Sequence, residues 1–243
     1  MNSEPKYQPI IQTGGATTSS NVLIKIKDIY KAFGDNQVLR GFNLTLHDQE
    51  NLVIIGKSGS GKSVLLKCIV RLNTPDSGEI IVLGKNIPEL DQEDMNTVRT
   101  DIGFLFQGSA LYDSMTVREN LEFPLRRHPD KLRGTSLEER VLEALESVGL
   151  AHTVDLMPEE LSGGMKRRIA LARTIIMRPK IILYDEPSSG LDPITSKEIS
   201  ELILEIQKKY QTASLIITHD MDFARHIANR MIILVDGVDY ASG

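Results

Sequence analysis

The chain has 243 residues, a net charge of −5 and one cysteine. Its apolar share of 41% and charged share of 25% are ordinary for a soluble globular protein, and its length allows one α/β domain with an insertion. The acidic balance argues against a nucleic-acid partner, because nucleic-acid binders usually carry a basic excess. Cys68 alone cannot form an internal disulfide, so we expect a reducing compartment and a small buried thiol.

The apolar runs are too short to cross a bilayer. The longest, such as residues 231–235, have the length of a strand, whereas a spanning helix needs about 20 apolar residues. No charged and then apolar signal peptide opens the chain. If the protein moves something across a membrane, another polypeptide must therefore supply the path.

The first 21 residues predict a flexible N-terminal tail, because Asn, Ser, Pro, Gly and Thr dominate them. Apolar residues alternate over 22–27 and 42–46, which predicts two edge strands. The continuous apolar run over 51–55 predicts a buried strand, and a helix is expected over 64–70. Two further strands are predicted over 79–83 and 101–106.

The pattern turns helical from about residue 108 to 178. Within this stretch, helices are predicted over 137–148 and 162–176, the first from a clear apolar stripe, and Pro179 closes the region. Three strands follow at 180–184, 214–218 and 231–235, with a helix at 194–210. Strands that alternate with helices predict a parallel sheet in an α/β core, with the helical middle inserted as a subdomain. The chain ends at Gly243 just after a strand, which leaves open a further C-terminal helix.

A phosphate-binding loop is the clearest motif. It fits the pattern G-x-x-x-x-G-K-[S/T], with a predicted strand before it and a helix after it. Glycines let backbone N–H groups turn inward around a phosphate, and the helix N-terminus adds the positive end of its dipole. We expect Lys62 to reach the outer phosphates and Ser63 to hold Mg²⁺; a Gly/Ser-rich surface turn is the alternative. The predicted nucleotide-binding residues here are Gly56, Lys57, Ser58, Gly59, Ser60, Gly61, Lys62, Ser63 and Val64.

Two carboxylates, Asp185 and Glu186, follow the predicted strand over 180–184. Ligands of open α/β sheets bind at strand ends. We therefore expect Asp185 to support the Mg²⁺ shell and Glu186 to orient or deprotonate the attacking water. The alternative is a pair of solvated loop residues.

Gln107 and His219 end two other predicted strands. The Gln107 amide could contact both Mg²⁺ and the water, and His219 could bond the γ-phosphate while holding Glu186 in place. Polar residues end strands routinely and a lone histidine is more often structural, so both assignments depend on the rest of the set. The predicted catalytic residues are thus Glu186, His219, Lys62 and Gln107, and the predicted metal site is Ser63, Gln107 and Asp185.

A second anion site is predicted where the helix over 162–176 begins. Ser162, Gly163 and Gly164 would offer a hydroxyl, free N–H groups and a helix dipole; an ordinary N-cap is the alternative. With this signature the chain resembles the ATPase subunits of the ATP-binding cassette family over nearly all of residues 22–243.

The resemblance implies a P-loop NTPase fold, with a core of mainly parallel sheet, an antiparallel β edge and an inserted helical subdomain. It also implies hydrolysis of ATP with Mg²⁺, an adenine-stacking ring at Phe33, and a place for Asp192 at a seam between two copies. Two residues depart from the family pattern. Met165 stands where the signature usually has Gln, and Phe33 stands where the ring is usually Tyr, although Phe still offers a stacking face.

The partners also follow from the resemblance. Two copies would sandwich two ATP molecules head to tail, with the phosphate loop of one copy facing residues 162–164 of the other. The helical insertion resembles the part of cassette ATPases that grips a cytoplasmic helix of a multi-span permease, which implies a peripheral position on the cytoplasmic face of the inner membrane. We expect Lys166, Arg167 and Arg168 to form a solvated helix face; contact with a partner is the alternative.

Other functions remain as alternatives. A soluble cassette ATPase of DNA repair, chromosome maintenance or translation fits less well, because the sequence shows no long coiled coil and only one cassette. A small-molecule P-loop kinase would leave residues 162–165 unexplained. Residues 106–125 and 156–168 resemble the Mla-type phospholipid-trafficking branch, which implies an MCE-type lipid-binding protein and allows a small regulatory subunit. A polar solute, such as an amino acid, is the alternative cargo.

Overall fold

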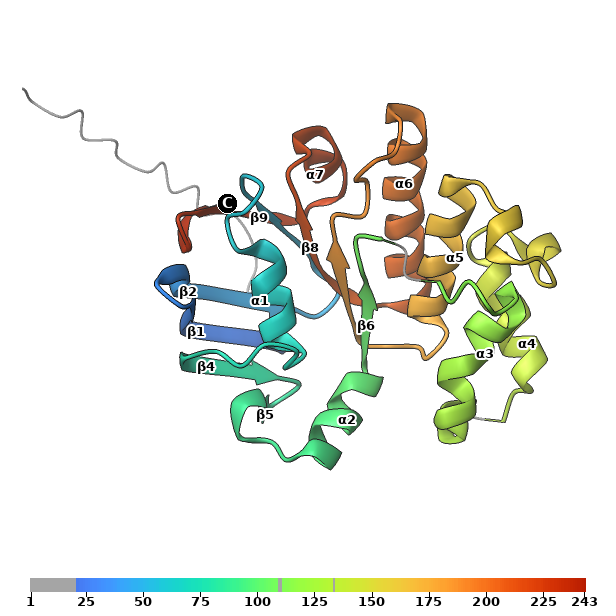
Figure 1. Cartoon of the computed structure of the whole chain (residues 1–243), viewed down its shortest axis with the longest axis horizontal. Helices are drawn as coiled ribbons and strands as arrows, with labels where there is room; N and C mark the ends of the chain where they lie inside the picture. Colours follow the sequence, from blue (N-terminus) through green and yellow to red (C-terminus); the bar gives the residue numbers. More distant parts are fainter. Residues whose placement is uncertain (1–20, 109–110, 133) are drawn as a thin grey trace, which may run out of the picture.

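The computed structural model describes residues 21–108, 111–132 and 134–243. The predicted N-terminal tail therefore lies almost wholly outside the described residues. An antiparallel sheet forms one side of the molecule, a mostly parallel sheet crosses its middle, and helices gather on the other side (Figure 1). This arrangement confirms the predicted α/β fold with parallel and antiparallel strands.

The antiparallel sheet has the strand order β2-β1-β4-β5. Its strands are β1 Val22–Phe33, β2 Asn36–His47, β4 Ser77–Val82 and β5 Lys85–Asn86. The sequence predicts an edge strand over 22–27, but this prediction is wrong, because β1 pairs on both sides and continues to Phe33. The apolar alternation breaks near Asp28, where a register shift and a φ of 49° mark a bulge.

The larger sheet has the order β10-β9-β3-β8-β7-β6, and all its pairs are parallel except that of β9 with β10. Its strands are β3 Asn51–Ile55, β6 Ile102–Leu105, β7 Ile181–Asp185, β8 Ala213–Thr218, β9 Arg230–Val235 and β10 Val238–Ser242. The five parallel strands lie within one residue of their predicted ranges. The sequence pattern missed β10, because it is exposed along its whole length.

Two hydrophobic cores flank the parallel sheet. Alternate residues of one strand serve both, so Leu52 and Ile54 pack toward the antiparallel sheet while Val53 packs toward the opposite face. The helix α1, Lys62–Ile69, lies in the first core between the two sheets and buries Leu65 and Leu66 there. The second core is covered by α5 Gly163–Ile175, α6 Pro193–Tyr210 and α7 Met221–Ile227.

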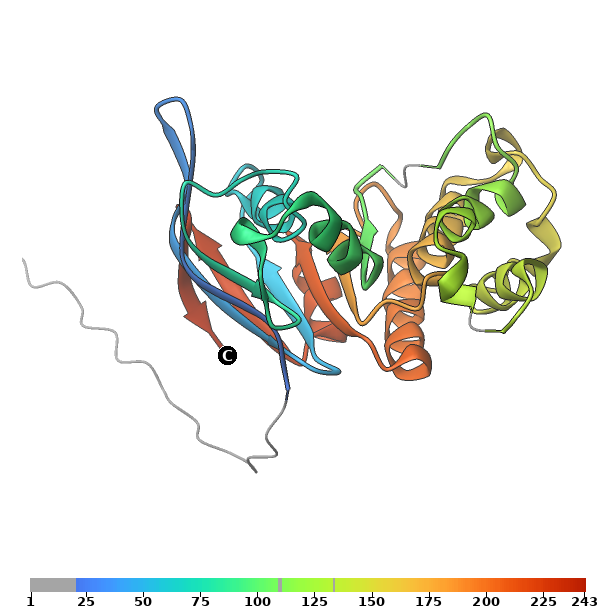
Figure 2. The same ribbon diagram turned by 90° about the horizontal axis from the view of Figure 1, so that it is seen from below.

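The helices α3 Val117–Arg127 and α4 Leu137–Glu146 pack with α5 at the end of the molecule farthest from the antiparallel sheet (Figure 2). Capping boxes start α3 at Thr116 and α4 at Ser136. Short 3₁₀ turns join these elements at Pro129–Leu132, Ala151–Thr153 and Pro158–Glu160.

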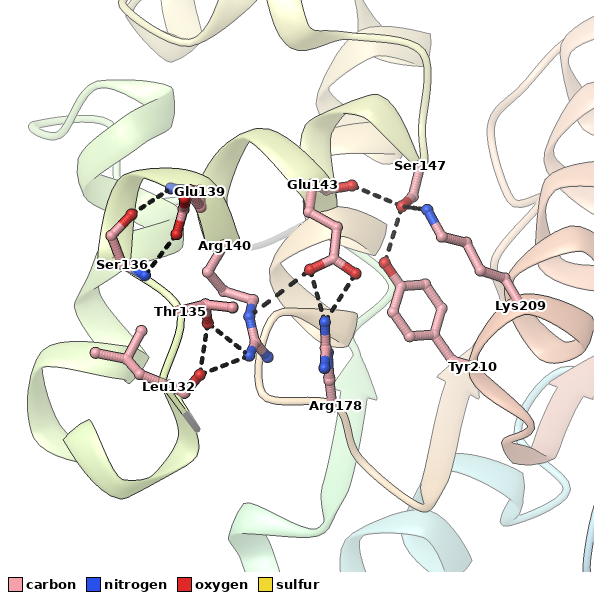
Figure 3. Close-up of polar contacts among 10 residues, drawn as sticks. All are labelled: Leu132, Thr135, Ser136, Glu139, Arg140, Glu143, Ser147, Arg178, Lys209 and Tyr210. Atoms are coloured by element: carbon pink, nitrogen blue, oxygen red, sulfur yellow. Dashed lines mark hydrogen bonds and ion pairs between the residues drawn. The ribbon is translucent and has the colours of Figure 1, made fainter.

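Side-chain bonds fix α4 to the parallel-sheet core (Figure 3). Arg178, just before β7, donates to both carboxylate oxygens of Glu143 at 3.0 and 2.8 Å. At the end of α4, the Ser147 hydroxyl lies 2.8 Å from both the Tyr210 hydroxyl and the Lys209 amine of α6. The helical end is therefore attached to the core at two places.

Outside the helical stretch predicted over 108–178, the sequence pattern missed two helices. The helix α2, Gln92–Thr100, follows a 3₁₀ turn at Ile87–Glu89 and buries only Met95 and Val98, so it carries little apolar periodicity. Its signal was the cap, because Asp91 accepts a hydrogen bond from the Asp94 N–H. The seven-residue α7 is too short to show a period. Within the described ranges, no helix combines the length and the apolar character needed to cross a bilayer.

Candidate functional site

The predicted site residues follow neighbouring parallel strands. The phosphate loop follows β3, His219 follows β8, Asp185 and Glu186 end β7, and Gln107 comes after β6. Because β3, β8, β7 and β6 are adjacent and parallel, these carboxyl ends meet at one edge of the sheet. The topology therefore gathers segments that are more than 150 residues apart in the sequence.

The phosphate loop is shaped for an anion. Gly61, the residue before α1, has a φ of 100°, a conformation that glycine adopts without strain. A Cβ at Gly56 would lie 2.7 Å from the Leu234 carbonyl oxygen and 2.7 Å from the Ser60 Oγ, so only glycine fits there. The Ser60 Oγ is buried and has no hydrogen-bond partner. An unsatisfied donor inside a glycine cradle fits a bound phosphate.

The Lys62 amine lies inside this loop, with its side chain 6% exposed. It donates to the carbonyl oxygens of Gly56 at 2.7 Å and Lys57 at 3.1 Å. It also lies 3.5 Å from Glu186 Oε1. The loop thus holds a desolvated cation beside the place where the next phosphates of a nucleotide would extend.

Ser63 and Asp185 bring together two of the oxygen groups of the predicted Mg²⁺ site. The Ser63 hydroxyl donates to Asp185 Oδ1 at 2.9 Å. Burial raises the pKa of Asp185, and the Ser63 hydrogen bond opposes that rise. A hydroxyl beside a buried carboxylate suits a hard divalent ion, since Mg²⁺ takes oxygen ligands and keeps several waters.

Glu186 is held in a strained position. Its φ is 51°, unusual for a residue with a side chain. Its N–H donates to the Ile217 carbonyl at 3.0 Å, which fixes the backbone to β8. Its Oε2 lies 2.8 Å from His219 Nδ1 and accepts from the His219 N–H at 3.3 Å. In a neutral imidazole, an Nδ1–H that donates to the Glu186 carboxylate leaves Nε2 as an acceptor, on a side chain that is 60% exposed.

A cavity of about 760 Å³ opens beside the phosphate loop. The loop and His219 form one side of it, and Ile233, Leu234, Val235 and Asp236 form the other. Sequence reasoning missed this second wall. The available signal was β9 itself, because a strand parallel to β3 must end at the same edge.

The other predicted site residues make no described contact with the phosphate loop. Among the described residues, no hydrogen bond or ion pair joins Phe33, Gln107 or residues 162–164 to the phosphate loop. Phe33 is half-exposed at the β1–β2 turn, where the Lys31 amine lies 5.2 Å from its ring centre. Gln107 is exposed.

Two further predicted site residues, Ser162 and Asp192, cap helices. The Ser162 hydroxyl accepts from the Met165 N–H at 3.2 Å, and Ser162 and Gly163 are exposed at the start of α5. Asp192 caps α6 and accepts from the Thr195 hydroxyl at 2.6 Å. This hydroxyl and the backbone N–H groups of α6 lower the pKa of Asp192.

One prediction about the signature helix is wrong. The sequence predicts a solvated face at Lys166, Arg167 and Arg168, but Arg167 is buried, with 5% of its surface exposed. Arg168 is partly exposed and pairs with Glu198 at 2.7 Å. A run of three basic residues cannot lie on one face of a helix, since successive residues are about 100° apart.

Comparison with known proteins identifies the family. A family model described as ABC transporter matches residues 39–189. The chain belongs to the ABC transporter family. It is 42% identical to the glutamine transport ATP-binding protein GlnQ of Geobacillus stearothermophilus over 88% of each chain. It is 40% identical to the methionine import ATP-binding protein MetN of Clostridium tetani over 88% of this chain and 67% of that one.

Two further similarities bear on function. The chain is 36% identical to the chloroplastic protein TRIGALACTOSYLDIACYLGLYCEROL 3 of Arabidopsis thaliana, over 97% of this chain and 74% of that one. A solved dimer of the ATP-binding cassette MJ0796, in a post-hydrolysis state bound to ADP and Pi, matches with a TM-score of 0.80 and 33% identity over 91% of this chain and 98% of that one. This ABC protein is therefore an ATPase that binds ATP with Mg²⁺.

The burial of the Asp185 carboxylate leads to a prediction about stability and turnover. Asp185→Asn keeps an oxygen for the Ser63 hydroxyl but removes a carboxylate whose ionised form burial disfavours. Without nucleotide, the melting temperature should stay the same or rise, whereas Mg²⁺-dependent ATP turnover should fall by about 10²-fold or more, because the charge that we expect to support Mg²⁺ is lost. Calorimetry and steady-state turnover check this, and a fall in both quantities together would contradict it.

Proposed function

We propose that this ABC ATPase is the energy-coupling subunit of a membrane transporter and hydrolyses ATP in a site shared by two copies. In each copy, Lys62 and the loop at 56–61 hold the phosphates, Ser63 and Asp185 support Mg²⁺ together with Gln107, and Phe33 stacks on the adenine. Bound ATP supplies the phosphoanhydride bond that is broken. Glu186 then orients and deprotonates water, while His219 Nδ1–H keeps its carboxylate in place.

The position of residues 162–164 carries the proposal of a shared site. They form a helix N-terminus, exposed at Ser162 and Gly163, which favours an anion, yet no bond joins them to the phosphate loop of their own chain within the described residues. A Cβ at Gly164 would lie 3.3 Å from Thr195 Cγ2, so this helix start lies directly beside the start of α6 that Asp192 caps. Both segments are available to a second copy, and MJ0796 is likewise described as a dimer.

A separate cavity supports a permease contact. About 430 Å³ in volume, it lies between α2, β6, α3 and α5, and it is lined by Arg99, Arg127, His128 and Arg173 among others. Gly103 and Phe104 of β6 line it as well, and β6 leads directly to Gln107. We propose that it receives a cytoplasmic helix with an acidic side chain, which places the ATPase on the cytoplasmic face of the membrane.

The cargo is inferred from relatives, because the proposed site would contact nucleotide and not the transported molecule. The names of GlnQ and MetN, at 42% and 40% identity, favour a polar solute such as an amino acid. Phospholipid is the second candidate. It is supported by the plant relative, which is named for a galactolipid and aligns with 97% of this chain. A lipid cargo would bring an MCE-type lipid-binding protein as a further partner, and either complex could include a small regulatory subunit.

Arg127→Glu tests the permease contact. The exposed Arg127 lies over the Phe123 ring at 4.5 Å and faces the basic cavity, so reversing its charge should repel an acidic helix. We expect the variant to keep its melting temperature and its ATP affinity but to recover at least about fivefold less multi-span protein from gently extracted membranes. Lys197→Glu is the matched control, since Lys197 is exposed on α6 and does not line this cavity.

The same preparation identifies the cargo. Mass spectrometry of the intact complex should find a bound amino acid or another polar solute if the importer reading holds, and phospholipid if the lipid reading holds. Recovery of the wild-type chain as a lone enzyme, fully active without any membrane protein, would contradict the proposed role in transport.

A further inference from the structure

The helix α5, which begins at the signature residues 162–164, buries one cationic side chain. Arg167 lies one turn into α5, and only 5% of its surface is exposed. Its Nε is buried without a hydrogen-bond partner, and within the described ranges no carboxylate forms an ion pair with it. A buried, unpaired arginine costs stability, so its presence calls for a function.

The guanidinium reaches two loops of the candidate site. Its Nη1 donates to the Phe106 carbonyl at 3.4 Å, and its Nη2 donates to the Ser189 carbonyl at 3.3 Å. Phe106 directly precedes Gln107, and the Ser189 N–H donates to the Glu186 carbonyl at 3.1 Å. One side chain therefore connects the loop of Gln107 with the loop that runs from Glu186 to Asp192.

Both bonds are at the long end of the hydrogen-bond range. Closer approach of either loop would strengthen its bond to the guanidinium, whereas withdrawal would leave a buried donor unsatisfied, which costs free energy. The planar fork of arginine, unlike the single amine of lysine, presents two separate nitrogens to two acceptors. Because both loops bond to the same guanidinium, the free energy of one loop's position depends on the position of the other loop.

We propose that Arg167 is a positioning residue that couples the Gln107 loop to the Glu186–Asp192 loop across the start of the signature helix. A displacement that reaches Gln107 from β6 passes through the guanidinium to the loop that carries Glu186. This inference rests on the proposed roles of Gln107 and Asp192.

Arg167→Met in the full chain separates this role from a structural one. We expect kcat for ATP to fall about tenfold with KM within about twofold of its original value, because phosphate binding is untouched. The melting temperature should hold or rise, because a buried unpaired charge is replaced by an apolar chain. Lys166→Met, which removes the neighbouring charge of the same helix, should change none of these, and Arg167→Lys should restore part of kcat.

A double-mutant cycle measures the coupling itself. Gln107→Ala and Asp192→Ala should each lower kcat. In the chain that keeps Arg167, the fall of kcat in the double variant should differ from the product of the two single effects by about threefold or more. With Arg167→Met present, the two effects should multiply simply. If Arg167→Met does not fold, the cycle in the Arg167→Lys background decides the question, with weakened coupling expected there.

The outcomes distinguish the proposed site roles of Gln107 and Asp192 from the proposed coupling role of Arg167. If Gln107→Ala and Asp192→Ala leave kcat unchanged, their proposed roles in the site are wrong. If both lower kcat but remain multiplicative in the Arg167 chain, the site stands and the coupling role of Arg167 is overturned. A parallel fall of kcat, ATP affinity and melting temperature in Arg167→Met would also overturn it, because it would show a purely structural role.

Discussion

A chain that carries Glu186→Gln is expected to bind ATP normally and to turn it over about 10²–10⁴-fold more slowly, the range that general-base groups contribute. The amide keeps the size of the side chain and can still accept the hydrogen bond from His219, but it cannot take a proton from water. ATP should therefore persist, and copies that close over it should stay closed. Turnover, ATP binding and sedimentation of the ATP-loaded variant measure these three effects.

The control is Glu201→Gln, because Glu201 is an exposed α6 carboxylate whose only described ion pair is with Lys197. It should leave turnover within about twofold, as expected for a surface substitution. Turnover near the wild-type rate in Glu186→Gln would remove Glu186 from the role of base and leave the strained backbone at this position unexplained.

The second large effect is expected for Ser162→Arg. A bulky cation at the exposed start of α5 would occupy the surface that we assign to the nucleotide of the opposite copy. Turnover should fall to background, whereas ATP affinity at the phosphate loop of the same chain should remain within about twofold, since no described contact joins the two places.

The substitution also removes a helix cap, which alone costs about 1 kcal/mol of stability. Ser136→Arg is the matched control. Ser136 caps α4 with a bond of 3.1 Å to the Glu139 N–H, close to the 3.2 Å bond of Ser162 to the Met165 N–H. This control should lose similar stability and keep its turnover. Full activity of Ser162→Arg would contradict a role for the signature in catalysis.

The parallel strands and the phosphate loop were readable from the sequence, because their signals are local. A continuous apolar run gives a buried strand such as β3, and a fixed spacing of glycines followed by Lys62 and Ser63 gives the loop. The contact of Glu186 with His219 was also predictable, since adjacent parallel strands bring their ends together.

The remainder depends on tertiary context. Nothing in the run Lys166–Arg168 marks Arg167 as buried, because that depends on which loops close over α5. The bulge that lets β1 continue to Phe33 and the sparse apolar content of α2 likewise arise from packing partners far along the chain. The cargo prediction shifted for another reason. The relatives that carry cargo in their names favour polar solutes at least as well as phospholipid.

The claim that a site is split between two copies is tested most directly by mixing two inactive variants. Lys62→Ala damages the phosphate loop, and Ser162→Arg damages the signature, so neither chain alone should hydrolyse ATP. In a mixed pair, one of the two sites would combine the intact loop of one chain with the intact signature of the other. Random pairing makes half of the pairs mixed, so roughly a quarter of the wild-type turnover should return. Turnover that stays at background, although the mixed pairs are shown to form, would contradict the account.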